Sequence, residues 1–137
     1  MRSVFLDPSV LLLAVGAQHP LREPCRSVVE AAARGDLRLH LSVEGGQEFL
    51  FHRLRRGSLE DALRLFDLVD DLVVWHAFDT EVLHRARALV ATGAVRGRDA
   101  IHAATALLAG FDSLISCDAD FDRVAGLRRV DPAVESV

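Results

Sequence analysis

The stretch SVFLDPSVLL, residues 3–12, decides the fold of the chain, because a strand pattern changes into a helix pattern within it. Residues 3–6 have the length and the apolar character of a buried strand. Pro8 suits the first turn of a helix, and an aspartate directly before it suits the N-cap. The stretch therefore predicts a strand that runs straight into a helix, with the carboxylate of Asp7 at the junction.

Short apolar runs recur along the chain and alternate with helical patterns. Four further runs of four or five residues predict strands, at 37–41, 72–75, 113–116 and 127–130. Apolar residues at helical spacing mark amphipathic helices near 59–69, 82–90 and 100–108, with Ser58 and Asp79 as N-cap candidates. Strands separated by helices require crossover connections, so the pattern predicts an α/β fold with a mostly parallel sheet. Ligand sites in such sheets lie beyond the carboxyl ends of the strands.

The strand predicted at 37–41 differs from the others in its pattern. Its sequence, LRLHL, alternates apolar and polar residues. Alternation is typical of a strand with one exposed face. We therefore expect this strand to lie near an edge of the sheet.

The length of 137 residues predicts one domain, spanning 1–137, with a core that needs no covalent staples. Two cysteines are too few for a disulfide scaffold, and we expect free thiols in a reducing cytosol. No apolar run reaches the ~20 residues of a membrane span, and no signal-peptide pattern is visible. We therefore expect a cytoplasmic protein that makes no membrane contact.

The chain contains no lysine, and all 16 of its basic residues are arginine, against 20 acidic residues. This composition disfavours P-loop nucleotide binding and Schiff-base catalysis, because both require a lysine. The net charge of −4 disfavours a protein that coats duplex nucleic acid, which would be basic overall. Phosphate chemistry that relies on carboxylates is compatible with both observations.

Four acidic residues stand where the predicted fold brings them to one crevice. Asp7 and Asp118 follow strands, Asp99 opens the helix near 100–108, and Glu48 lies beside the apolar face of a helix beginning near Ser42. Each also has a structural explanation: a helix cap, a turn residue, a charge complementing a helix dipole and a solvated side chain, respectively. Converging carboxylates repel one another unless a cation joins them, and oxygen ligands favour Mg²⁺ or Mn²⁺. Such a site suits the hydrolysis of phosphodiesters.

The chain resembles the PIN-domain ribonucleases, and specifically the VapC-type toxins of bacterial toxin–antitoxin pairs. The resemblance spans essentially the whole chain. Three segments carry it, and a fourth is weaker: FLDPSVLL at 5–12, RDAIHAA at 98–104, LISCDADF at 114–121 and, more weakly, QEFL at 47–50.

The resemblance implies a three-layer α/β/α fold with a short-stranded sheet, and a metal-dependent endoribonuclease that cuts structured RNA, often transfer or ribosomal RNA. It implies Mg²⁺, with Mn²⁺ as an alternative, a VapB-type antitoxin that blocks the site, and a homodimer. The catalytic and metal-binding residues of the family fall on four acids: Asp7, Glu48, Asp99 and Asp118. Two hydroxyl positions of the family fall on Ser9 and Ser116.

This sequence departs from the family pattern in three places, one of which is Asp120, a competitor of Asp118 in the last motif. Pro8 occupies a position that is usually small and polar or alanine. Gly45 and Gly46 are expected to loosen the helix that must present Glu48, because each glycine costs ~1 kcal/mol in a helix interior. Glu44 is therefore an alternative to Glu48 at that position of the site.

Other polar residues lie close to the predicted acids in the sequence. Asp120 is an alternative or an addition to Asp118. His102 and His52 share a helix face with Asp99 and with Glu48, respectively. We expect structural or supporting roles for the two histidines, with general-base catalysis as the alternative.

Two groups of arginines are the best candidates for phosphate contacts. The denser group lies at residues 53–56, and Arg96 and Arg98 form the second. The guanidinium group suits phosphate contacts, although a solvated helix end explains the same residues. The main alternative function is a PIN-fold RNA-binding or protein-interaction module without activity, and a further one is a phosphatase that acts on small molecules.

Overall fold

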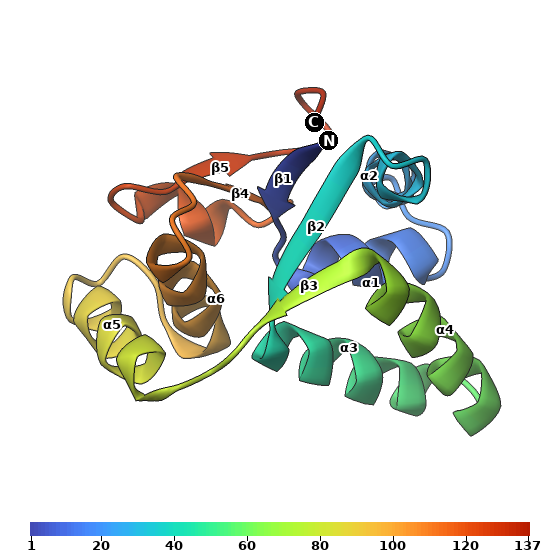
Figure 1. Ribbon diagram of the computed structural model, residues 1–137, viewed down its shortest axis with the longest axis horizontal. Coiled ribbons are helices and arrows are strands. Elements are labelled where there is room, and N and C mark those ends of the chain that lie inside the picture. Colours follow the sequence, from blue (N-terminus) through green and yellow to red (C-terminus); the bar gives the residue numbers. More distant parts are fainter.

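Five short strands form the centre of the chain in the computed structural model, which describes all residues from 1 to 137 (Figure 1). Their ends agree with the predicted strands to within one residue. The strands are β1 (Arg2–Phe5), β2 (Leu37–Ser42), β3 (Val73–His76), β4 (Ser113–Ile115) and β5 (Arg128–Val130).

Six α-helices and one short 3₁₀-helix connect the strands. Two of the predicted N-caps are present, since Ser58 accepts from Asp61 N–H and Asp79 accepts from Val82 N–H. None of the helices is both long and apolar enough to cross a lipid bilayer. The helices are α1 (Pro8–Val15), α2 (Arg22–Ala33), α3 (Val43–Arg56), α4 (Leu59–Leu72), α5 (Thr80–Ala91), α6 (Gly97–Leu108) and the 3₁₀-helix η1 (Ala119–Arg123).

All strand pairs are parallel, as predicted. One ladder has the order β1-β2-β3, the other joins β4 to β5, and a parallel bridge between Leu6 and Ile115 links the two ladders. The spatial order is therefore β3-β2-β1-β4-β5. Strand β2 pairs with one side of β1, whereas β4 lies on the other side of β1. The strand order therefore reverses at the β1/β4 boundary. Open α/β sheets bind ligands at such a point, outside the carboxyl ends of the strands.

The expectation that the strand at 37–41 lies near an edge is wrong, because β2 lies between β1 and β3. Its alternation has another cause. Three leucines face one core, whereas His40 on the other face packs against the rings of His76 and Phe111. His40 Nδ1 lies 2.9 Å from His76 Nε2. An aromatic and histidine cluster thus covers the face that the pattern assigned to solvent.

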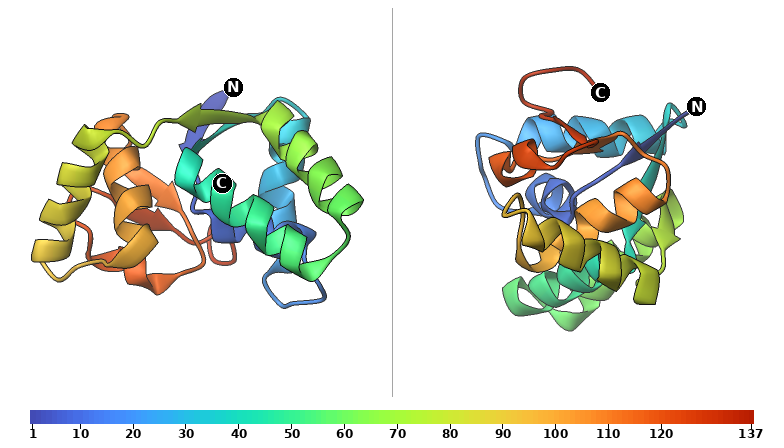
Figure 2. Two further views of the ribbon diagram at one scale, coloured as in Figure 1. Left: turned by 90° about the horizontal axis from the view of Figure 1, so that it is seen from below. Right: turned by 90° about the vertical axis from the view of Figure 1, so that its left-hand side faces the viewer.

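Two hydrophobic cores confirm the three-layer α/β/α arrangement. In β1, Val4 belongs to the core on one face of the sheet, and Phe5 belongs to the core on the other. Helices α1 to α4 supply the first core, and α5 and α6 supply the second. Figures 1 and 2 show these two groups of helices on opposite sides of the strands.

Two glycines near the start of α3 allow close packing and do not interrupt the helix, which runs unbroken from Val43 to Arg56. A Cβ atom on Gly46 would lie 2.8 Å from the indole of Trp75. A Cβ on Gly45 would lie 3.3 Å from Leu41 and 3.5 Å from the ring of Pro8. The missing Cβ atoms therefore leave room for the Trp75 indole at Gly46 and for the side chains of Leu41 and Pro8 at Gly45.

We predict that Gly46→Ala lowers the free energy of unfolding. The gain in helix propensity of ~1 kcal/mol is outweighed by overpacking against Trp75, which costs ~1–3 kcal/mol. The indole cannot move freely, since it stacks on Phe66 and donates from Nε1 to Asp70 Oδ1 at 2.7 Å. Urea unfolding measures the change.

Gly45→Ala is the matched control, because the nearest neighbour there is the flexible end of a leucine side chain. It should be tolerated better than Gly46→Ala. In a Trp75→Leu background, Gly46→Ala should become neutral or stabilising. An equal loss of stability from Gly46→Ala in both backgrounds would show that contact with the indole is not the cause.

Candidate metal centre

Asp7 is buried where β1 ends and α1 begins, with only 5% of its surface exposed. Its backbone occupies the N-cap position, but its side chain makes no capping hydrogen bond. Instead, Oδ2 accepts from the hydroxyl of Ser9 and from Ser116 Oγ at 2.9 Å. Helix capping therefore does not account for this carboxylate, and its second oxygen, Oδ1, has no hydrogen-bond partner within the chain.

Ser116, at the end of β4, connects Asp7 to the next acidic segment. Its hydroxyl donates to Asp7 and accepts from the backbone N–H of Asp118 at 2.9 Å. Asp118 in turn caps η1, because its Oδ1 accepts from Asp120 N–H at 2.9 Å. The predicted turn role of Asp118 is thus present, and the same turn holds Asp118 beside the site.

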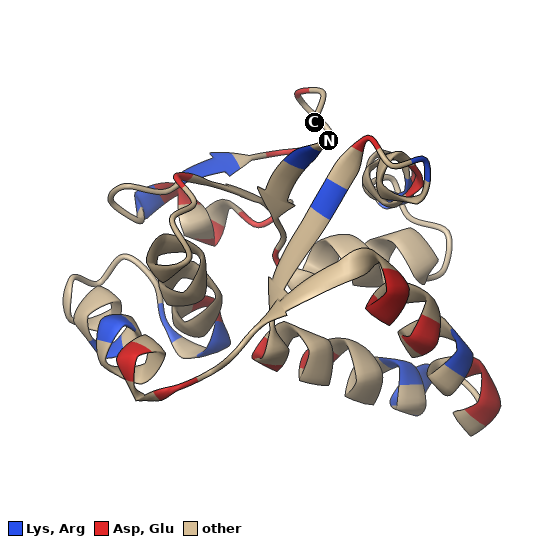
Figure 3. Cartoon of the chain, viewed as in Figure 1, with Lys and Arg blue, Asp and Glu red and all other residues tan.

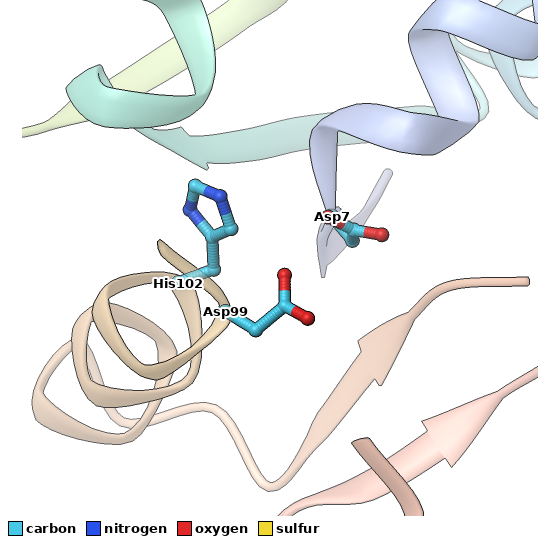
Figure 4. A group of neighbouring side chains, drawn as sticks. All are labelled: Asp7, Asp99 and His102. Carbon is cyan, nitrogen blue, oxygen red and sulfur yellow. The ribbon is translucent and has the colours of Figure 1, made fainter. Parts of the chain in front are cut away.

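Asp99, in the first turn of α6, is the residue on which the acids converge. Ligand atoms of Asp7, Asp99 and His102 lie within 4.8 Å of one another, and so do those of Asp99, Asp118 and Asp120. Figure 4 shows Asp99 and His102 beside each other on α6, with the Asp99 carboxylate directed toward the side of Asp7. Asp120 accompanies Asp118 in this arrangement and does not replace it.

The electrostatics of the aspartates is unfavourable without a cation. The pKa of Asp99 is raised to about 6, chiefly by burial and then by the charge of Asp7, with smaller increases from Asp118 and Glu48 and an opposing effect of His102. Burial also raises the pKa of Asp7, although the hydroxyl hydrogen bonds oppose this. None of the three aspartates pairs with an arginine. Carboxylates arranged in this way are stabilised by a bound cation.

Glu48 lies outside both groups of converging acids and contacts them through His102. His102 is buried, and its Nε2 lies 3.3 Å from Glu48 Oε1. Its Nδ1 lies 2.8 Å from Ser42 Oγ, which also accepts from Gly45 N–H at the start of α3. All three contacts are satisfied when Ser42 donates to Nδ1 and Nε2–H donates to Glu48. His102 therefore connects α6 to the helix that carries the glutamate.

Glu44 and Glu48 share one arginine. Arg98 Nε lies 3.3 Å from Glu44 Oε1 and 3.7 Å from Glu48 Oε1. Only Glu48 also contacts His102, which places it nearer the aspartates than Glu44. The geometry therefore favours Glu48 over Glu44 as the glutamate of the site.

The donor set fits a hard divalent cation. Carboxylate oxygens of Asp99 lie close to those of Asp7 in one group and to those of Asp118 and Asp120 in the other, without a cysteine in either group, as Mg²⁺ and Mn²⁺ prefer. Both nitrogens of His102 are engaged by Ser42 and Glu48, so this residue supports the glutamate and is not available as a ligand.

The sequence interpretation did not include Ser42 in the site, although a signal for it exists. Ser42 is the last residue of β2, so it lies at the same edge of the sheet as Asp7 after β1 and Ser116 after β4. Because the sequence pattern marks Ser42 as the start of the following helix, its place at the end of the strand was not recognised. Ser42 could have been found by reading the residue that follows the predicted strand 37–41.

Comparison with known proteins places this geometry in a family. A sequence model described as PIN domain matches residues 4–127. Ribonuclease VapC7 of Mycobacterium tuberculosis is 33% identical over 132 residues, which cover 94% of this chain and 91% of that protein. Ribonuclease VapC13 of the same organism is 29% identical over 132 residues, with 93% and 98% covered.

Solved structures share the fold at lower sequence identity. A chain of VapBC2 from Rickettsia felis, bound to a DNA fragment from its promoter, superposes with a TM-score of 0.72 at 16% identity, covering 95% of this chain and 98% of that one. A chain of a toxin–antitoxin complex from Klebsiella pneumoniae gives 0.71 at 18%, covering 94% and 97%. The predicted recognition of the PIN fold is confirmed.

We predict that Asp99→Asn stabilises the metal-free protein at pH 7.5. The folded pKa is raised, so the carboxyl binds more protons in the folded state, and the stability of the wild type falls as the pH rises from about 4 toward 6. Asparagine removes this dependence. Thermal unfolding in EDTA should show a higher midpoint for Asp99→Asn at pH 7.5 and a much smaller difference at pH 4.5.

Asp67→Asn is the matched control, because Asp67 is exposed on α4 and forms no ion pair. It should leave the midpoint nearly unchanged at both pH values. Added Mn²⁺ should stabilise the wild type and Asp67→Asn but not Asp99→Asn. A lower midpoint for Asp99→Asn in EDTA at pH 7.5 would contradict the repulsion inferred for this site.

We predict that His102→Leu weakens Mn²⁺ binding by about 10-fold, the usual cost of losing a residue that orients a ligand. The leucine fills similar space but cannot donate to Glu48. His102→Gln retains an N–H donor and should recover part of the affinity, measured by titration with electron paramagnetic resonance of free Mn²⁺. Equal affinities for the Leu and Gln variants would limit His102 to a packing role.

Proposed function

We propose a function for this chain from one premise: it belongs to the PIN-domain family, and within it to the VapC ribonucleases. The chain is a metal-dependent endoribonuclease toxin that hydrolyses phosphodiester bonds in RNA. One observation carries this conclusion. Asp99 on α6 has ligand atoms close to those of Asp7, which follows β1, and close to those of Asp118, which follows β4, at the switch point of the sheet, and no arginine of the chain neutralises these aspartates.

Asp7 and Asp99 would be the principal ligands of the divalent ion, with Mg²⁺ the expected ion and Mn²⁺ the alternative, and Asp118 would hold metal-bound water or a second ion. Such an ion, when bound, activates water and neutralises charge that develops on phosphorus. The hydroxyls of Ser9 and Ser116 fix Oδ2 of Asp7, which leaves Oδ1 as its ligand atom. Glu48, oriented by His102 and Arg98, completes the acidic site and accepts hydrogen bonds from water at its edge.

The substrate class follows from the family and from the arginines. We propose structured RNA, such as transfer or ribosomal RNA, cut in the cytoplasm. The free thiols of Cys25 and Cys117 fit such a reducing compartment.

A protein antitoxin and a second copy of the chain are the proposed partners. The neighbouring solved structures are described as VapBC and toxin–antitoxin complexes, which supports a VapB-type antitoxin for this chain as well. Several large apolar side chains are exposed on α3, α4 and α5, among them Phe51, Leu63 and Leu83. Exposed apolar side chains favour protein interfaces, and the homodimer is proposed on this ground.

The inactive module is less favoured by the structure than an active enzyme. A binding module does not need unneutralised buried carboxylates, which cost stability. Asp7, Asp99 and Asp118 belong to groups of close ligand atoms, Glu48 contacts His102 beside them, and burial raises the pKa of Asp7. A small-molecule phosphatase would use the same metal centre as the ribonuclease and would differ from it in its substrate. An experiment is therefore needed to distinguish these two functions.

We predict that the purified chain cuts total cellular RNA into discrete fragments with Mg²⁺ or Mn²⁺ and not in EDTA. Asp7→Asn should reduce the rate by at least about 100-fold, because it removes a charged ligand of the metal. Gel analysis of the fragments gives the rate, and Asp67→Asn should cut like the wild type.

A parallel assay with p-nitrophenyl phosphate tests the phosphatase. Hydrolysis of this ester without cleavage of RNA would assign a phosphatase function to the chain in place of the ribonuclease function. Equal cleavage of RNA by the wild type and by Asp7→Asn would show that the proposed metal centre takes no part in the reaction.

A further inference from the structure

Two hollows adjoin the metal centre between α1 and α3. The first, of about 630 Å³, lies between the two helix ends, and the second, of about 350 Å³, lies along α3 beside Glu48. They share Leu12 and His52, so they form one trough along α3, which we name the α3 trough. Its polar and aromatic lining consists of Ser9, Gln18, His19, Gln47, Glu48, Phe51, His52, Arg53, Arg55, Arg56 and Arg98.

The charge of the trough is opposite to that of the chain as a whole. The first hollow is lined by Arg53, Arg56 and two histidines, and it has no acidic residue. Arg55 and Arg98 line the second hollow, where Glu48 is the only acid. In a chain of net charge −4, this is a concentrated cationic surface. Figure 3 shows the arginines at the C-terminal end of α3.

The arginines at the end of α3 have no anionic partner in the protein. Arg53, Arg55 and Arg56 form no ion pair, in contrast to Arg64 on the neighbouring helix, which pairs with Asp61 at 2.6 Å. Arg53 Nε and His52 Nδ1 are shielded from solvent and lack hydrogen-bond partners. The unsatisfied N–H donor of Arg53 lowers stability, and an anion in the trough would accept a hydrogen bond from it.

The trough is continuous with the metal centre at both hollows. Ser9, which donates to Asp7, lines the first hollow, and Glu48 lines the second. A ligand that lies in the trough therefore has one part beside the carboxylates. Phe51 adds a ring that is 46% exposed, on which a nucleobase can stack.

We propose that the α3 trough binds the single-stranded segment of RNA next to the bond that is cut. Arg53 and Arg56, one helical turn apart, contact successive phosphates, and Phe51 stacks on a base. This inference rests on the proposed ribonuclease function and adds the path of the substrate to it. RNA is favoured over an acidic protein segment because the trough leads to a centre for phosphodiester hydrolysis and combines arginines with an exposed ring.

The test compares two double variants of equal charge change. Arg53→Gln with Arg56→Gln alters the trough, and Arg85→Gln with Arg87→Gln alters exposed, unpaired arginines on α5, on the opposite side of the sheet (Figure 1). The probe is a fluorescent 12-nucleotide RNA of mixed sequence, and fluorescence anisotropy in EDTA reports its binding without cleavage. A glutamate-rich peptide of 12 residues is the second probe.

The trough variant should bind the RNA about 10-fold more weakly, and the slope of log Kd against log salt should fall by about 1.4 for two lost phosphate contacts. The α5 variant should bind within about twofold of the wild type, since its charges act only at long range. With Mg²⁺, the trough variant should show a raised KM for RNA cleavage and a smaller change in kcat. Thermal unfolding should confirm that both double variants are folded.

Three outcomes overturn the proposal. One is equal RNA affinity of the two double variants, and another is a trough variant that loses kcat with KM unchanged. The third is a peptide that binds through the trough arginines more tightly than the RNA, which assigns the trough to a protein segment. If the wild type cuts RNA in any of these cases, the ribonuclease function stands and only the trough fails. A wild type that does not cut RNA refutes the function itself.

Discussion

The buried carboxylate of Asp7 is the constraint on which the rest of the structure depends. It lies where β1 ends, where α1 begins and where the bridge from Leu6 to Ile115 joins the two ladders of the sheet. No arginine compensates its charge, so the surrounding chain must stabilise it by hydrogen bonds without neutralising it. Hydroxyl groups satisfy both requirements, because each donates one hydrogen bond and carries no charge.

Ser116 stabilises Asp7 in this way, and Ser42 plays a similar part for His102. Ser116 accepts from the backbone of Asp118 and donates to Asp7, while Ser42 accepts from the backbone of Gly45 and contacts His102. Each hydroxyl is thus fixed by a turn or helix start on one side and supports an ionisable side chain on the other. The arginine that does enter the site, Arg98, pairs with the two glutamates at its rim. Positive charge is therefore kept at the periphery, where it does not compete with a metal ion.

The strands and the parallel sheet could be predicted from the sequence because their signals are local: short apolar runs, bounded by turn residues and separated by amphipathic helices. The position of β2 could not, because its polar face packs against His76 and Phe111, which are distant in the sequence. For the candidate site, strand ends indicated Asp7 and Asp118. The separation of Glu48 from the aspartates by His102 depends on how α3 packs against α6, and local pattern does not contain this information. The same holds for the α3 trough, which exists only where α1 and α3 meet.

The contact between Gly46 and Trp75 also constrains how this chain can diverge. The indole occupies the volume of a Cβ atom at position 46, so the two positions share one space. Among descendants of this sequence, a larger residue at 46 is compatible only with a smaller one at 75, and the two should covary. Helix α3 also carries the glutamate and arginines of the α3 trough. A substitution at position 75 in the sheet that changes the packing of α3 therefore also changes the shape of the proposed substrate path.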